Sequence, residues 1–178
     1  MVYEKKDKIF LLGFMGSGKT TVGRKIARAL HYDFYDLDHY IEAFTGEYIS
    51  NIFRDKGEAY FRDLETECLS HFNDKKFIVL ATGGGTPCFN DNIHTMLAQG
   101  CCVYIKMPEA ALFQRLHQAT PKRPLLLGKS ETELREYIHD TLEKREEIYA
   151  QSHIIIDGIN LSTPSLIGVL NHKMIHKS

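Results

Sequence analysis

The sequence contains no tryptophan, five prolines, four cysteines and no long hydrophobic run. No apolar run approaches the roughly 18 residues of a membrane-spanning helix, so we expect no transmembrane segment. The cysteines show no C-x-x-C spacing, which favours reduced thiols over a disulfide framework or a zinc site. The first ten residues include no small-residue cleavage site, so we expect no signal peptide and a cytoplasmic protein.

An excess of charge of either sign is also absent. The 178-residue chain has 22 Lys and Arg against 23 Asp and Glu, a formal net charge of −1. This balance gives no bulk attraction to nucleic acid or to an anionic membrane, so anion binding has to come from locally placed basic groups. With 43% hydrophobic and 25% charged residues, the composition is that of an ordinary globular protein, and we expect residues 1–178 to form one domain.

Short apolar runs alternate with amphipathic segments along the chain. Apolar runs predict strands, here over residues 8–12, 32–36, 77–82, 101–105 and 154–156. Apolar positions at helical spacing predict helices between them, over residues 19–30, 58–72, around 93–97, from 108, from a Ser130–Glu133 capping box to about 150, and from 163. Such alternation predicts an α/β fold with a parallel sheet and helices on both faces.

The strongest motif follows the first predicted strand. Residues 13–20, GFMGSGKT, fit the phosphate-loop pattern G-x-x-x-x-G-K-[ST]. The glycines let successive backbone N–H groups face phosphate oxygens, and the following helix adds the positive end of its dipole. In this motif the Lys19 ammonium reaches the β- and γ-phosphates and the Thr20 hydroxyl coordinates Mg²⁺. The sequence therefore predicts a nucleoside triphosphate site.

Two aspartates, Asp36 and Asp38, end the second predicted strand. Ligands of a parallel sheet gather at the carboxyl ends of its strands, so we expect both near the phosphate loop. One would hold Mg²⁺, directly or through water, and the other would accept a proton from an attacking hydroxyl. A structural interpretation, compatible with the catalytic one, is that Asp38 caps a helix beginning at His39.

Three consecutive glycines, Gly83 to Gly85, follow the third predicted strand. A tight turn needs fewer, so the run favours close approach by a small ligand. Residues 120–130 hold two prolines, a glycine and three basic residues between two predicted helices. A solvated loop would explain this composition, but the phosphate site favours a mobile lid that brings Arg123 onto the transferring phosphate.

Two arginines lie on or beside apolar helical stripes. Arg145 falls near the centre of the apolar face of the 130–150 helix, where a guanidinium needs an anion. Periodicity leaves open whether that anion is Glu58 or Glu65, or a ligand carboxylate. Arg62 has Glu58 four residues before it and Glu65 three after it. This spacing fits either a surface ladder of ion pairs or a Glu65 that holds Arg62 ready to grip an anion.

Together these segments closely resemble the shikimate kinase family, small P-loop kinases of the nucleoside-monophosphate-kinase type. The likeness covers nearly the whole chain, from residue 13 to residue 157. It is carried by GFMGSGKTTVGR, by DLD at 36–38, by IFRDKGEAYFRDLE around Arg62, by GGG at 83–85, by RPLL from Arg123 and by REEIY from Arg145. The phosphate loop is shared by many ATPases, whereas the combination is far more specific.

The resemblance implies an enzyme that transfers phosphate from ATP to the 3-hydroxyl of shikimate, with Mg²⁺ as cofactor. It implies a three-layer α/β/α sandwich whose five-stranded sheet has the order 2-3-1-4-5. It also implies a monomer, with residues 39–72 as the substrate-binding subregion, residues 118–131 as the lid, and no nucleic-acid or membrane partner.

The same likeness implies a role for each matching residue. Lys19, Asp38 and Arg123 would act in catalysis, with Asp38 as base or orienter for the attacking hydroxyl. Asp36 would bind Mg²⁺ through water beside Thr20. ATP would contact Gly16, Ser17, Gly18, Lys19, Thr20, Thr21, Arg115 and Arg123. Shikimate would contact Asp38, Phe53, Phe61, Arg62, Gly83, Gly84, Gly85 and Arg145, with both arginines on its carboxylate.

Three positions depart from the family pattern. Glu147 stands where many members have proline, Arg115 precedes Arg123 by eight residues instead of seven, and residues 157–160 contain no basic residue. The spacing of Arg145 and Tyr149 is kept.

Two other functions are compatible with parts of the sequence. Another small-metabolite kinase of this fold, such as a gluconate kinase, would share the phosphate loop and the lid. The triple glycine and the paired arginines favour a cyclic polyol carboxylate over gluconate. A nucleotide-binding module without turnover is disfavoured because Lys19, Asp38 and Arg123 are all present.

Overall fold

The computed structural model describes residues 7–118, 124–126 and 128–175. Within them, five parallel strands form one sheet in the predicted order β2-β3-β1-β4-β5. The strands are β1 (Lys8–Leu12), β2 (Asp33–Asp36), β3 (Ile78–Ala81), β4 (Cys101–Lys106) and β5 (Ile154–Asp157). Each differs by at most one residue at either end from the range that the apolar runs predict.

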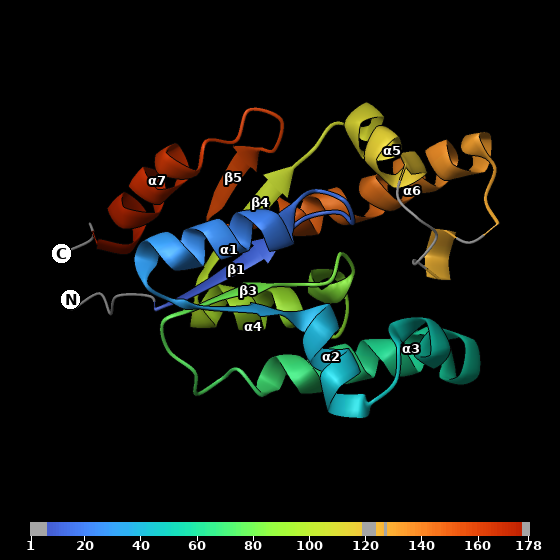
Figure 1. The fold of residues 1–178 in the computed structure, drawn as a ribbon, viewed down its shortest axis with the longest axis horizontal. Coiled ribbons are helices and arrows are strands. Elements are labelled where there is room, and N and C mark those ends of the chain that lie inside the picture. Colours follow the sequence, from blue (N-terminus) through green and yellow to red (C-terminus); the bar gives the residue numbers. More distant parts are fainter. Residues whose placement is uncertain (1–6, 119–123, 127, 176–178) are drawn as a thin grey trace.

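The helices are α1 (Lys19–Leu30), α2 (Leu37–Thr45), α3 (Ile49–Ser70), α4 (Asn92–Gln99), α5 (Glu109–Gln118), α6 (Glu131–Tyr149) and α7 (Thr163–Ile175), with short 3₁₀ turns η1 (Thr86–Cys88) and η2 (Pro124–Leu126). They cover both faces of the sheet (Figure 1). One buried cluster joins α1 and α7 to one face, and a larger one joins α3, α4, α5 and α6 to the other. The α/β/α sandwich is therefore confirmed.

Strand β1 shows why the sheet is covered twice. All five of its residues are buried, and its four apolar residues alternate between the two clusters: Ile9 and Leu11 face α1 and α7, whereas Phe10 and Leu12 face the larger cluster. Successive side chains of a strand point to opposite faces, so a continuously apolar strand has to be covered on both sides.

Two helix boundaries differ from the predictions. The predicted 58–72 helix is the second part of α3, which begins at Ile49 and bends at Gly57, where φ is 82° and ψ is 172°. The bend at Gly57 breaks the regular helical spacing of apolar residues along α3. The spacing therefore does not identify the segment before Gly57 as part of the same helix. Helix α2 begins at Leu37, and its N-cap is Asp36, whose Oδ1 accepts a hydrogen bond from the Asp38 N–H at 3.2 Å. The predicted cap at Asp38 is therefore wrong.

The Ser130–Glu133 capping box at the start of α6 is confirmed. The Ser130 hydroxyl accepts from the Glu133 N–H at 3.3 Å, and the Glu133 carboxylate accepts from the Ser130 N–H at 2.7 Å. Residues 119–123 and 127 of the predicted lid, Arg123 among them, lie outside the described residues. In the part of the chain that the structure covers, no helix has the length and apolar content to cross a bilayer.

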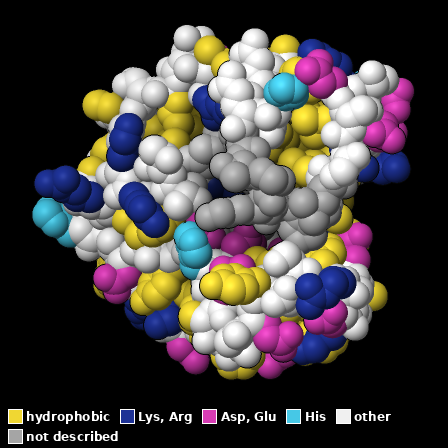
Figure 2. All heavy atoms as spheres, turned by 45° about the vertical axis from the view of Figure 1, so that its right-hand side comes forward, with side chains coloured by type: hydrophobic (Ala, Val, Ile, Leu, Met, Phe, Trp, Pro, Cys, Tyr) yellow, Lys and Arg dark blue, Asp and Glu magenta, His cyan; other side chains and the backbone are white. Residues whose placement is uncertain are grey.

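The strand pairing brings three functional segments together. Ala81 of β3 pairs with Leu11 of β1 on one side and with Asp36 of β2 on the other. The phosphate loop, the start of α2 and the triple glycine leave these strands at the same edge of the sheet, as Figure 1 shows. Figure 2 is turned toward this side of the molecule, where basic and acidic side chains are intermixed.

Candidate active site

The phosphate loop joins β1 to α1 and depends on glycine at three positions. Gly13, Gly16 and Gly18 have φ values of 142°, 80° and 98°, which residues with a Cβ rarely adopt. Gly18 is the N-cap of α1 and has no side chain to cap the helix. The first backbone N–H groups of α1 are therefore not capped by a side chain and can donate to a group bound in front of the helix. This geometry suits a phosphate group.

Lys19 is buried within the curl of this loop. Its Nζ donates to the backbone oxygens of Gly13 at 2.8 Å and Phe14 at 2.9 Å, and it lies 3.4 Å from the Ser17 hydroxyl. The ammonium therefore holds the loop in shape. It also lines a cavity of about 650 Å³ together with Gly16, Gly18, Thr20 and Thr21, which we call the donor cavity.

Thr20 and Asp36, which sequence reasoning assigns to a metal ion, lie side by side. The Thr20 hydroxyl donates to Asp36 Oδ2 at 2.6 Å, while the other carboxylate oxygen caps α2. Both residues line the donor cavity. A hydroxyl and a carboxylate offer the hard oxygen ligands that Mg²⁺ prefers, with phosphate oxygens and water completing its shell, so the residues fit that ion.

Arg115 of α5 reaches the same loop from the other side. Its Nη1 donates to the Gly16 carbonyl at 3.0 Å. A Cβ added at Gly18 would lie 3.6 Å from that nitrogen, so the guanidinium is close to the start of α1. The structure thus places Arg115 beside the predicted phosphate site, whereas Arg123 lies outside the described residues.

A second cavity, of about 540 Å³, adjoins the first, and we call it the acceptor cavity. It brings together all the residues predicted to bind substrate: Asp38, Phe53, Phe61, Arg62, Gly83, Gly84, Gly85 and Arg145. Met15, Asp38 and Gly84 line both cavities. A group held in one cavity can therefore meet a group held in the other at these three residues.

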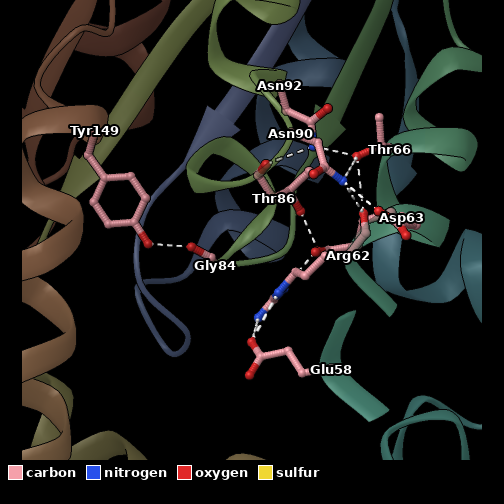
Figure 3. Close-up of polar contacts among 10 residues, drawn as sticks. Glu58, Arg62, Asp63, Thr66, Gly84, Thr86, Asn90, Asn92 and Tyr149 are labelled. Atoms are coloured by element: carbon pink, nitrogen blue, oxygen red, sulfur yellow. Dashed lines mark hydrogen bonds and ion pairs between the residues drawn. The ribbon is translucent and has the colours of Figure 1, made fainter. Parts of the chain in front are cut away.

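Arg62 is fixed by two carboxylates of its own helix. Its Nη1 donates to the buried Glu65 at 2.5 Å, and its Nη2 donates to the half-exposed Glu58 at 2.7 Å (Figure 3). Burial works to lower the pKa of Arg62, but the charges and hydrogen bonds of both glutamates outweigh it and raise that pKa. The Arg62–Glu65 pair is therefore buried and is not part of a surface ladder of ion pairs.

Glu65, which the spacing in the sequence makes a candidate for holding Arg62, is itself supported by Thr86, which the sequence does not identify. Burial raises the pKa of Glu65, and the Arg62 charge and the Thr86 hydrogen bond oppose that rise. Thr86 donates to Glu65 at 2.6 Å, and its own carbonyl accepts from the side chain of Asn92 (Figure 3). The i, i+3 spacing of Arg62 and Glu65 points to their pairing, but no sequence pattern identifies the supports from η1 and α4.

Arg145 is equally buried but is paired differently. Arg145 as a whole residue is 8% exposed, and no Asp or Glu in the described ranges forms an ion pair with it. Glu58 and Glu65, the structural partners considered from the sequence, both bind Arg62. A buried guanidinium without a carboxylate partner is costly unless a ligand supplies the anion, which favours the ligand interpretation for Arg145.

Two of the three glycines lie where a side chain would meet the Arg62–Glu65 ion pair. A Cβ at Gly83 would lie 2.5 Å from Glu65 Oε1, and one at Gly85 would lie 2.4 Å from Arg62 Nη1. The backbone of this turn thus passes directly over the buried ion pair. Met15, Ile49, Glu65 and Leu125 also line the acceptor cavity, although none of them is among the predicted site residues. The three apolar ones carry no sequence signal that separates them from core residues.

Comparison with known proteins agrees with this geometry. The family model described as shikimate kinase matches residues 15–172. A shikimate kinase from Bacteroides fragilis is 43% identical over 160 residues, which is 90% of this chain and 89% of that protein. The crystal structure of shikimate kinase from Bacteroides thetaiotaomicron has a TM-score of 0.85 and 39% identity, over 93% of this chain and 97% of that one. Shikimate kinase from Acinetobacter baumannii, solved in complex with shikimate, has a TM-score of 0.85 and 34% identity, over 97% and 94%.

The two glutamates beside Arg62 allow a test of which ion pair stabilises the site. We expect Glu65→Gln to lower the free energy of unfolding by about 3 kcal/mol, because it leaves a buried guanidinium poorly compensated. Glu58→Gln removes the charge of the other carboxylate that binds Arg62, which is half-exposed. We expect it to lower the free energy of unfolding by less than about 1 kcal/mol. Urea unfolding of both variants measures the difference, and equal losses would contradict the assignment of Glu65 as the main support.

Proposed function

This chain belongs to the shikimate kinase family, and we propose on that basis how its two adjoining cavities serve the reaction. The reaction is the ATP-dependent phosphorylation of shikimate in aromatic amino-acid biosynthesis, giving shikimate 3-phosphate and ADP. The observation that carries the proposal is the shared lining: the donor and acceptor cavities meet at Met15, Asp38 and Gly84. Both reactants can therefore lie in line across Asp38.

The donor cavity binds ATP. The N–H groups of the phosphate loop and the Lys19 ammonium contact its phosphates, and Arg115 lies against the same loop. Thr20 and Asp36, which lie side by side in this cavity, would hold the Mg²⁺ that accompanies ATP. Bound there, the ion neutralises charge on the phosphate oxygens.

The acceptor cavity binds shikimate through its carboxylate. Arg145 supplies the unpaired charge, and Arg62 supplies an oriented guanidinium beside it. Phe53 and Phe61, whose ring centroids are 4.6 Å apart, form an apolar wall for the carbon ring. Residues 39–72, which contain this wall and Arg62, are the substrate-binding subregion in this proposal.

Asp38 acts at the junction. The shikimate 3-hydroxyl oxygen forms a bond to the γ-phosphorus as its proton passes to the Asp38 carboxylate. The bond between the γ-phosphorus and the oxygen bridging to the β-phosphate breaks, and ADP leaves with that electron pair.

A coupled ADP-release assay with Mg·ATP tests the reaction, run with shikimate, with gluconate and with no acceptor. We expect ADP release that depends on shikimate. Release that depends on gluconate would assign another small-metabolite kinase. ATP binding without stimulation by either compound would indicate a nucleotide-binding module without turnover.

Asp38→Asn tests the catalytic role. The amide keeps the shape of the carboxylate but cannot take the proton, so we expect kcat to fall by about 10²- to 10⁴-fold while both reactants still bind. Steady-state kinetics with shikimate and ATP varied in turn measures the effect. Asp33→Asn, at the other end of β2, is the matched control. Near-normal turnover of Asp38→Asn would remove Asp38 from the chemistry.

Arg145→Leu tests the carboxylate site. Losing a buried, charge-assisted partner should weaken shikimate binding by roughly 2–3 kcal/mol, while ATP binding stays nearly unchanged. Titration calorimetry with each ligand measures the two affinities. Arg135→Leu removes the same group from α6 at an exposed position, where the guanidinium lies over Phe113, and should leave both affinities unchanged. An equal fall in ATP affinity for Arg145→Leu would show that Arg145 is not the carboxylate ligand.

A further inference from the structure

A buried tyrosine contacts the active site without lining either cavity. Tyr149, the last residue of α6, is 0% exposed. Its hydroxyl donates a hydrogen bond to the carbonyl oxygen of Gly84, as Figure 3 shows. Gly84 lines both the donor and the acceptor cavity, so this bond ties the end of α6 to the point where they meet.

The same hydroxyl is coupled to Arg145. Arg145 precedes Tyr149 by four residues, so the two side chains lie on one face of α6. Burial raises the pKa of the Tyr149 hydroxyl, and the positive charge of Arg145 and its hydrogen bonding to that hydroxyl lower it only in part. The hydroxyl therefore stays protonated at neutral pH, which lets it donate to Gly84 and face Arg145 with its oxygen.

Gly84 has little freedom to move away from this contact. A Cβ added there would lie 3.2 Å from the Met15 backbone nitrogen and 3.6 Å from Arg145 Nη1. The Gly84 peptide is therefore enclosed by the phosphate loop on one side and by Arg145 and Tyr149 on the other.

We infer that Tyr149 is a positioning residue for the shikimate site, because its hydroxyl holds Arg145 and the Gly84 peptide in one arrangement. Arg145 has no ion-pair partner among the described residues, so its orientation depends on neutral contacts such as this one. A guanidinium free to turn away from the cavity would bind a carboxylate more weakly, since the ordering would then have to occur on binding. This inference rests on the proposed role of Arg145 as a carboxylate ligand, and it assigns to Tyr149 the orientation of that guanidinium.

A neighbouring tyrosine offers a matched control. Tyr104 of β4 is also buried, and its ring centroid lies 5.0 Å from that of Tyr149. Its hydroxyl donates to Glu146 at 2.7 Å, away from Gly84, and it lines neither cavity. Tyr149→Phe and Tyr104→Phe thus each remove one buried hydroxyl from the same aromatic pair and leave both rings in place.

We expect Tyr149→Phe to raise the KM for shikimate about tenfold, with the KM for ATP changed less than twofold. We expect Tyr104→Phe to change both constants less than twofold. Without ligand, the melting temperatures of the two variants should differ from that of the wild type by similar amounts, because each variant loses one buried hydroxyl. A loss of stability alone would therefore not distinguish Tyr149→Phe from Tyr104→Phe. The rise in melting temperature that saturating shikimate gives the wild type should be reduced in Tyr149→Phe alone.

Two results would overturn the inference: an unchanged KM for shikimate in Tyr149→Phe, or equal increases in both variants. The wild-type protein in the same assay tests the proposed function separately. A wild type that phosphorylates shikimate alongside an unimpaired Tyr149→Phe would reject only the role of Tyr149. A wild type that releases no ADP with shikimate would reject the proposed function and with it the inference.

Discussion

Parallel pairing of β1, β2 and β3 is the constraint on which the site depends. Backbone hydrogen bonds set Ala81 beside both Leu11 and Asp36, so all three strands end at one level. The chain leaves each strand with a different chemical group: a phosphate-binding curl, a pair of carboxylates and a glycine turn. Parallel sheets place ligands at the carboxyl ends of their strands, and here the adjacent ends supply both cavities and the boundary between them.

The two arginines of the acceptor cavity are equally buried, but their charges are balanced differently. Arg62 is held by Glu65 and Glu58, so its charge is largely matched within the protein and its orientation is set before a ligand arrives. Arg145 has no carboxylate partner in the described part of the chain. The cavity thus combines a guanidinium that is ion-paired within the protein with one that is not, and in the proposed function the second pairs with the ligand carboxylate.

Much of this arrangement could be predicted from the sequence, because local signals determine it. The strands are recognisable as continuously apolar runs, and the phosphate loop as a fixed pattern between a strand and a helix. The helix before Gly57 could not be predicted, since the bend interrupts the apolar periodicity. Periodicity also left the partner of Arg145 open, because a buried guanidinium can be satisfied by the protein or by a ligand, and only the family resemblance pointed to the ligand.

The triple glycine lines the acceptor cavity, but the structure gives a further reason for the missing side chains. The sequence suggested room for a ligand, yet the space beside Gly83 and Gly85 is taken by Glu65 and Arg62. The absent side chains let the turn lie directly on the ion pair, with Gly84 left facing both cavities. The phosphate loop lies beside Gly84, so the donor and acceptor cavities meet at this peptide. A Cβ at Gly84 would lie 3.2 Å from the Met15 backbone nitrogen, so the absence of a side chain at position 84 lets the glycine turn pack closely against the phosphate loop.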